Sequence, residues 1–306
     1  MNKFSAVIIS AFFLFSNSTQ ASEKPNVIAS FSIIGDMVRE VAGDNVELTI
    51  LVGANGDAHE YQPTASDAKK LANADLVLVN GLGFEGWLQR LVKSADYKGK
   101  ISVVSQGIKT LEVAAEESHH SEHKHHEEQE GAKDPHAWQD LENGKIYVKN
   151  IADALSIADK ENSKLYQYRA AEYIKKLDAL HKSIKGEFSK IPAEKRKVIT
   201  THDAFAYFAK AYGIEFTSLQ GVSTESEASA ADMARIIEQV RAKKASALFL
   251  ENMTDSRLIK QLQKDTGAYI GGTLYSDALS SENEPAGNYI AMFGHNSAEL
   301  IKAMRK

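Results

Sequence analysis

The chain has 306 residues, of which 36 are basic, 41 are acidic and none is cysteine, and its formal net charge is −5. This mildly acidic balance gives no electrostatic reason to expect a nucleic-acid or anionic-lipid partner. The absence of cysteine excludes disulfides, thiolate metal ligands, a cysteine nucleophile and a lipid-modified cysteine within this sequence.

Residues 1–21 have the pattern of a cleaved signal peptide, with Lys3, an apolar stretch at 6–15 and small residues before Ser22. The stretch is shorter than the roughly 20 residues that span a bilayer, and a retained amphipathic anchor is the alternative. We expect a soluble mature protein without a lipid anchor, which favours a Gram-negative periplasm.

The first half of the mature chain alternates short apolar runs with helical patterns. Buried parallel strands are predicted at 26–31, 46–52, 75–79 and 101–105. Helices are predicted at 33–41, 66–74 and 84–94. A capping box in Thr64-Ala65-Ser66-Asp67 opens the second of these helices.

A long helical region and a second alternating half follow. Residues 143–188 are predicted to be helical almost throughout, most continuously over 161–188, which would span about 40 Å. Later strands are predicted at 197–201, 214–218, 245–250 and 269–274, and helices at 204–212, 230–243, 256–266 and 297–305.

These elements predict an α/β protein of two lobes, each with a central, mostly parallel sheet flanked by helices, joined by a long rigid helix. The predicted divisions are a signal peptide at 1–21, an N-terminal lobe at 22–158, a linking helix at 159–189 and a C-terminal lobe at 190–306.

A histidine-rich tract holds five of the ten histidines within eight residues: His119, His120, His123, His125 and His126. Burying these rings would desolvate each of them, so we expect the loop at about 113–133 to be solvated and mobile. Imidazole is a common metal ligand, so the tract predicts weak accessory metal sites that raise the local zinc concentration. The alternatives are docking of a metallochaperone, sensing of excess zinc, or a loop without a role.

An ordered metal site is predicted from residues outside the tract. His59, His202 and Asp277 follow predicted strands, where open α/β sheets bind ligands, and His136 lies between the two halves. Three imidazoles and a carboxylate suit a tetrahedral Zn²⁺ in a cleft between the lobes. Taken singly, each histidine could equally be an ordinary polar or capping residue, because no two of them are close in sequence.

The roles of other polar residues are predicted from their positions in the sequence. Glu60, Asp203 and Glu251 are candidates to support the imidazoles by hydrogen bonding, although each could equally be a cap or a surface acid. His181, within a helix, and His295, before a predicted cap at Asn296, are interpreted as structural.

Four segments resemble the zinc- and manganese-type solute-binding proteins of metal ABC importers, and the resemblance covers essentially the whole mature chain. The segments are 56–88, 134–138 (DPHAW), 201–214 and 271–280. The resemblance implies two α/β lobes joined by a rigid helix, with one metal held by His59, His136, His202 and Asp277. The family often continues DPHAW with Leu-Asp-Pro, whereas this chain has Gln139-Asp140-Leu141, a departure that concerns the backbone near His136 rather than the ligand.

The third ligand position, that of His202, bears on the identity of the metal. The resemblance implies glutamate there in manganese-type members and histidine in zinc-type members. His202 and the histidine-rich insertion are similar to the zinc type, and nitrogen ligands favour Zn²⁺ over Mn²⁺. The expected function is capture of periplasmic Zn²⁺ by a monomer that is not an enzyme, and delivery to a membrane permease driven by an ATPase.

Three rival functions stay open. The first is import of manganese, copper or nickel. The second is a zinc hydrolase with Glu60 as base, against which stand the closing ligand Asp277 and the absence of an HExxH motif. The third is a surface adhesin, for which the chain has no evident means of display.

Overall fold

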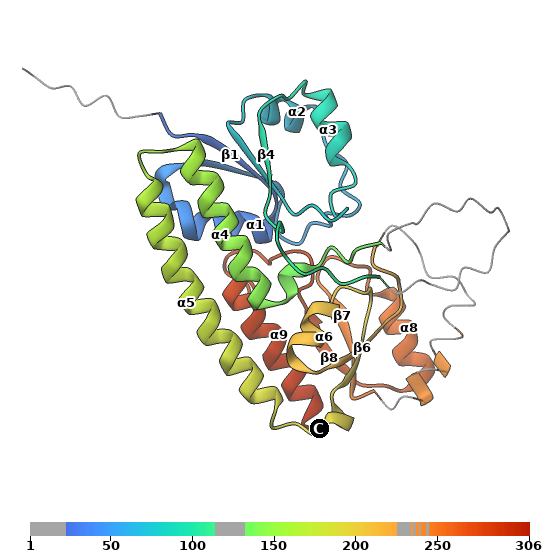
Figure 1. The fold of residues 1–306 in the computed structure, drawn as a ribbon. Coiled ribbons are helices and arrows are strands. Elements are labelled where there is room, and N and C mark those ends of the chain that lie inside the picture. Colours follow the sequence, from blue (N-terminus) through green and yellow to red (C-terminus); the bar gives the residue numbers. More distant parts are fainter. Residues whose placement is uncertain (1–22, 114–131, 225–233, 235–236, 239, 243–244) are drawn as a thin grey trace, which may run out of the picture.

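The computed structural model describes residues 23–113, 132–224, 234, 237–238, 240–242 and 245–306 (Figure 1). The predicted signal peptide, the five histidines of the tract and most of the helix predicted at 230–243 lie outside these residues. Among the residues that are described, no helix is both long enough and apolar enough to cross a bilayer.

The first lobe is built on a four-stranded parallel sheet. Its strands are β1 (Asn26–Phe31), β2 (Glu47–Val52), β3 (Leu76–Val79) and β4 (Lys100–Val103), in the order β2-β1-β3-β4. β1 and β3 are apolar and almost wholly buried, as central strands covered on both faces must be. All four bounds agree with the predicted strands to within two residues.

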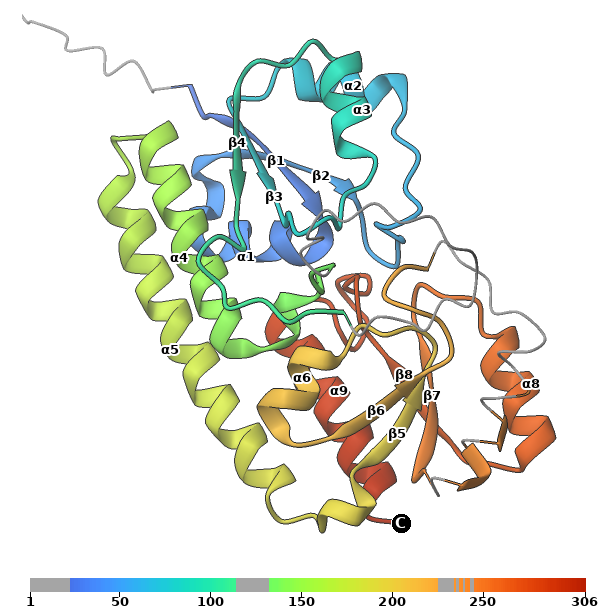
Figure 2. The same cartoon turned by 45° about the vertical axis from the view of Figure 1, so that its right-hand side comes forward.

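The second lobe repeats this topology. Its parallel strands are β5 (Lys197–Thr200), β6 (Glu215–Ser218), β7 (Ala247–Glu251) and β8 (Ile270–Leu274), in the order β6-β5-β7-β8 (Figure 2). The predicted strands are again within two residues of these bounds. The predicted fold class, two α/β lobes with parallel sheets, is therefore confirmed.

Helices flank both sheets. The first lobe has α1 (Ser32–Ala42), α2 (Ala65–Ala72) and α3 (Leu88–Ser94), and the second has α6 (Ala206–Tyr212), α8 (Arg257–Thr266) and α9 (Tyr289–Met304). The capping box predicted for α2 is present, because the side chains of Thr64 and Asp67 each accept a hydrogen bond from the other's backbone N–H.

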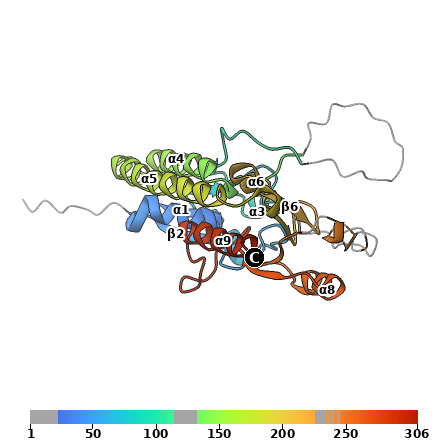
Figure 3. The same ribbon diagram turned by 90° about the horizontal axis from the view of Figure 1, so that it is seen from below.

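The near-continuous helix predicted at 143–188 is in fact two helices, α4 (Leu141–Ala158) and α5 (Ser163–Phe188), packed side by side. Asp159 causes the break: its backbone leaves the helical region, and its carboxylate accepts hydrogen bonds from Asn162 and Tyr166. α5 alone is about 39 Å long. It runs beside both lobes (Figures 1 and 3).

The start of α9 also differs from the prediction of a helix at 297–305 with Asn296 as its cap. The N-cap is Asn288, which accepts a hydrogen bond from the Ala291 N–H, because Tyr289 and Met292 extend the buried apolar face toward the N-terminus. Asn296 lies inside the helix and instead bonds both backbone groups of Tyr275, just beyond β8.

One hydrophobic core extends through both lobes. It contains Val27 and Val77 of the first sheet together with Val198, Phe208 and Phe293 of the second lobe. The helices α1, α4, α5 and α9 contact one another and carry this core between the lobes. Buried hydrogen bonds also cross from one lobe to the other, for example from the Tyr289 N–H to Asp36 (2.9 Å) and from the Leu279 N–H to Ser32 (3.0 Å).

Candidate metal centre

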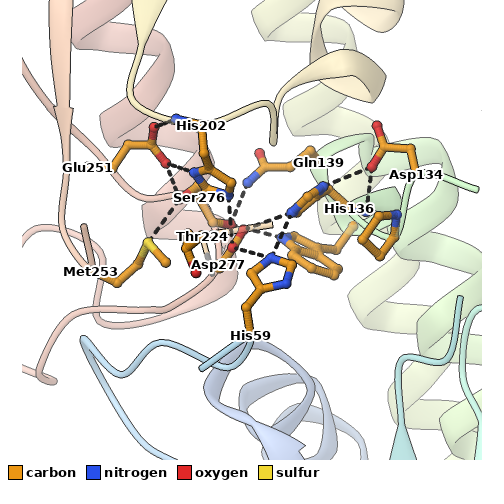
Figure 4. A network of polar contacts seen from close by, with 12 residues as sticks. His59, Asp134, His136, Gln139, His202, Thr224, Glu251, Met253, Ser276 and Asp277 are labelled. Carbon is orange, nitrogen blue, oxygen red and sulfur yellow. Dashed lines mark hydrogen bonds and ion pairs between the residues drawn. The ribbon is translucent and has the colours of Figure 1, made fainter. Parts of the chain in front are cut away.

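Four side chains predicted to bind metal lie together between the lobes: His59, His136, His202 and Asp277 (Figure 4). One potential ligand atom of each lies within 4.8 Å of all the others. Asp277 Oδ2 is 3.2 Å from the Nε2 of His59 and 3.0 Å from that of His202, and the Nε2 atoms of His59 and His136 are 3.3 Å apart. Ligand atoms of a tetrahedral zinc site lie about 3.4 Å apart, so this arrangement has the dimensions of a single-ion site.

The ends of three strands supply three of these residues. His59 follows β2, His202 follows β5 and Asp277 follows β8. Because the chain leaves each parallel strand at its carboxyl end, these ends of the two sheets face one another across the site. His136 comes from the segment that leads into α4, which the fold places between the lobes.

The cluster is enclosed by protein. His136, His202 and Asp277 are completely buried, and His59 is 8% exposed. The rings of Phe84 and Trp138 lie against His59 and His136, with centroid separations of 4.7 and 5.3 Å. Charges are poorly screened in such surroundings, so the cluster needs a balancing charge, either from protons or from a cation.

Two of the three imidazoles are oriented by carboxylates. Nδ1 of His136 lies 2.8 Å from Asp134, and Nδ1 of His202 lies 2.6 Å from Glu251. Because an ionised carboxylate can only accept, Asp134 places the proton of His136 on Nδ1 and directs its Nε2 toward the centre of the cluster. Nδ1 of His202 contacts Glu251 as an ion pair, outside hydrogen-bond geometry. The same carboxylates also accept backbone N–H groups, that of His136 for Asp134 and those of Thr201 and His202 for Glu251.

Of the three residues predicted to support the imidazoles, only one contacts a ligand ring among the described contacts. Glu251 contacts His202 as expected. Asp203 is half-buried, and burial followed by the nearby Asp134 raises its pKa, but among the described contacts none joins its side chain to an imidazole. Glu60 is exposed, and in the part of the chain that the structure describes its side chain contacts no imidazole.

Asp134 is a supporting residue that was not predicted from the sequence. An Asp two residues before a His can bond both the backbone N–H and the ring of that residue, and this spacing is the signal that could have identified it. The two histidines interpreted as structural have partners outside the cluster: His181 contacts Tyr212, and His295 contacts the carbonyl of Thr273.

Protons bind tightly to the metal-free cluster. Burial lowers the pKa of His136, but Asp277 and Asp134 together outweigh it and raise this pKa to about 9. Burial likewise opposes the effect of Glu251 and Asp277 on His202, whose pKa is nevertheless well above its usual value. Burial raises the pKa of Asp277, but His202 and His136 outweigh it and hold this pKa well below its usual value. An entering cation must therefore displace protons at neutral pH.

We expect the free energy of unfolding of the metal-free protein to fall as the pH rises from about 6.5 toward about 9. The pKa of His136 is raised by folding to about 9, so its proton stabilises the fold fully below the unfolded value and is lost as the pH passes the folded one. Thermal unfolding in excess chelator between pH 6 and 9.5 measures this decline. The zinc-loaded protein should lack this decline, and His136→Gln should reduce it to the part that His202, whose pKa is also raised, contributes. A flat profile for the metal-free wild type would contradict the assignment.

Residues 27–303 match the family described as "Zinc-uptake complex component A periplasmic". The chain belongs to this family. It is 33% identical over 312 residues to the manganese ABC transporter substrate-binding lipoprotein PsaA of Streptococcus pneumoniae, covering 99% of this chain and 96% of that one. It is 35% identical to the iron ABC transporter substrate-binding lipoprotein MtsA of Streptococcus pyogenes serotype M1, covering 94% and 91% of the two chains.

Solved structures agree with this assignment. The periplasmic zinc-binding protein TroA of Treponema pallidum superposes with a TM-score of 0.82 at 32% identity, covering 92% of this chain and 99% of that one. A manganese-bound mutant of the periplasmic metal-binding protein of Candidatus Liberibacter asiaticus gives 0.79 at 34% identity, covering 91% and 98%. The protein is thus the metal-binding component of an ABC importer, works with a membrane permease and an ATPase, and is not an enzyme.

The relatives differ from one another in the metal that their names specify, and two of them differ from the sequence-based expectation of a protein without a lipid anchor. Their names specify manganese, iron or zinc, so the cargo varies among proteins of similar sequence. The two streptococcal relatives are lipoproteins, in contrast to the expectation of a protein without a lipid anchor. Cysteine does not occur among the 306 residues of this chain.

Proposed function

We propose that this protein captures Zn²⁺ in the periplasm with His59, His136, His202 and Asp277 and delivers it to the permease. The observation that supports zinc is the donor set, in which three imidazole nitrogens and one carboxylate oxygen all lie within 4.8 Å of one another. Imidazole ligation suits zinc, whereas manganese prefers more oxygen ligands and a higher coordination number.

The surroundings of His202 also favour this cargo. The Glu251 carboxylate lies 2.6 Å from the His202 ring and accepts two backbone N–H bonds in the same loop. A glutamate at position 202 would bring a second carboxylate against Glu251, and like charges at this separation repel strongly when buried. The loop is therefore suited to an imidazole at the position where an oxygen ligand would favour manganese.

Manganese is the second candidate, supported by the names of the streptococcal and Liberibacter relatives. Copper and nickel would also accept imidazoles, and their loading would depend on the metals that are available. The histidine-rich tract fits the zinc proposal as a set of weak accessory sites, with docking of a metallochaperone as its alternative role.

A competition titration against a chromogenic chelator tests the cargo. The mature protein lacking residues 116–130 should bind one equivalent of Zn²⁺ tightly and bind Mn²⁺ at least about 100-fold more weakly, roughly 2.7 kcal/mol. The undeleted mature protein, titrated in parallel, should show the same tight equivalent plus weaker ones. Manganese affinity within threefold of zinc affinity would favour the manganese candidate, and loss of the tight equivalent on deletion would place main-site ligands in the tract.

A further inference from the structure

Two side chains that follow His136 donate hydrogen bonds to one backbone carbonyl in the other lobe. Trp138 Nε1 lies 2.9 Å from the carbonyl oxygen of Ser276, and Gln139 Nε2 lies 2.6 Å from the same oxygen. Trp138, Gln139, Ser276 and Asp277 all have 0% exposure. Figure 4 shows the Gln139 amide beside the Ser276–Asp277 segment, between the imidazoles of His136 and His202.

The orientation of the Gln139 amide follows from its partner. A carbonyl oxygen only accepts hydrogen bonds, so the NH₂ group of Gln139 must face Ser276. The other end, Oε1, is buried and has no hydrogen-bond partner among the described residues. Burying an amide oxygen without a hydrogen bond lowers the stability of the fold, and an apolar side chain would fill the same space without this loss. Stability alone therefore does not explain a glutamine at this position.

The bonded carbonyl belongs to the peptide unit that links Ser276 to Asp277. Fixing its direction fixes the rotation of this unit, and so the direction in which the Asp277 side chain leaves the backbone. The other side of Ser276 is also held, because its hydroxyl donates to Glu251 (2.6 Å). Glu251 in turn contacts His202. The peptide unit is therefore held from the first lobe by Gln139 and Trp138, and from the second by Glu251.

We propose that Gln139 is a positioning residue that holds the Asp277 carboxylate against the three imidazoles and thereby slows release of the metal. The inference rests on the proposed ligand set. Trp138 cannot replace Gln139, because its indole has a single N–H and already donates it to the same oxygen. Without Gln139, one of the two hydrogen bonds that fix this carbonyl from the first lobe is lost.

The test is the rate of zinc dissociation into excess chelator from the full mature protein. Gln139→Met keeps the length of the side chain but removes the donor, and should accelerate release from the tight site about five- to tenfold. The tight equivalent itself should remain. In the Asp277→Ala background the same substitution should have no further effect, because a residue that acts through Asp277 has nothing left to position. Gln139→Leu provides a second variant if the methionine variant folds poorly.

Asn143→Leu is the matched control. It removes the hydrogen bond that the Asn143 amide donates to the Ala137 carbonyl (3.1 Å). This carbonyl lies on the first-lobe side of the same turn and does not reach Asp277. The effect of Asn143→Leu on release should be the same in the wild-type and Asp277→Ala backgrounds. An unchanged rate in Gln139→Met, or an equal acceleration in both backgrounds, would overturn the role of Gln139. Unaltered zinc affinity in Asp277→Ala alone would instead overturn the proposed ligand set.

Discussion

His202→Ala should lower zinc affinity by at least about 100-fold, roughly 2.7 kcal/mol, and remove the tight equivalent. Changing a residue that only orients a ligand costs 10- to 100-fold in typical sites, and here the ligand itself is lost. The site would keep two imidazoles and the carboxylate, with a cavity where the buried ring had been. Chelator competition on the protein lacking residues 116–130 measures the loss without interference from the tract.

His181→Ala is the control for this substitution. His181 is a similarly buried histidine, but its ring contacts Tyr212 and lies outside the cluster. Its replacement should change the thermal unfolding temperature while leaving zinc affinity within about twofold. If His202→Ala retained zinc affinity within threefold of wild type, His202 could not be a ligand and the zinc proposal would lose its main support.

Glu251→Gln should weaken zinc binding by about 10- to 100-fold although Glu251 is not a proposed ligand. Glu251 uses both carboxylate oxygens, one to accept two backbone N–H groups and the other beside the His202 ring, whereas a glutamine keeps the shape but has only one acceptor oxygen. The neutral amide also removes a charge that raises the pKa of His202, which relieves proton competition at low pH. The loss of affinity should therefore be larger at pH 8 than at pH 6.

Titrations at both pH values, with Glu60→Gln as the control, measure this effect. Glu60 neighbours a proposed ligand in sequence but is exposed, so its replacement should leave zinc affinity unchanged. Equal losses for the two variants would indicate a general effect of negative charge rather than support of the His202 ring. A loss that is independent of pH would contradict the role of Glu251 in proton binding.

The strands could be predicted from sequence because buried parallel strands are short, continuous apolar runs. Val27–Phe31 and Leu76–Val79 are examples, because their side chains are buried on both faces of the sheet and neighbouring strands pair along both edges. Helix boundaries were harder to predict, because they depend on single polar residues. Asp159 ends one helix and helps to start the next, and Asn296 looks like a cap in sequence but bonds Tyr275 from inside α9.

The cluster itself could be proposed from sequence because strand ends are where α/β sheets bind ligands. The residues that hold it could not be identified as readily. The bonds from Trp138 and Gln139 to Ser276 join residues more than 130 positions apart, and they depend on how the two lobes pack. Asp134 had a local signal, its spacing from His136, whereas nothing local distinguishes Gln139 from a solvent-exposed glutamine.

The core shared by the two lobes determines how the site can be loaded. A hinge rotation wide enough to open the site fully would draw water over aromatic residues such as Trp138 and Tyr289, which bond across the lobes and are now completely buried. Exposing several such rings costs several kcal/mol, a large part of the stability of a typical protein. We therefore expect exchange of the ion to displace the ligand-bearing loops rather than to separate the lobes. To remove the ion, the transporter then has to supply only the free energy that displaces these few residues.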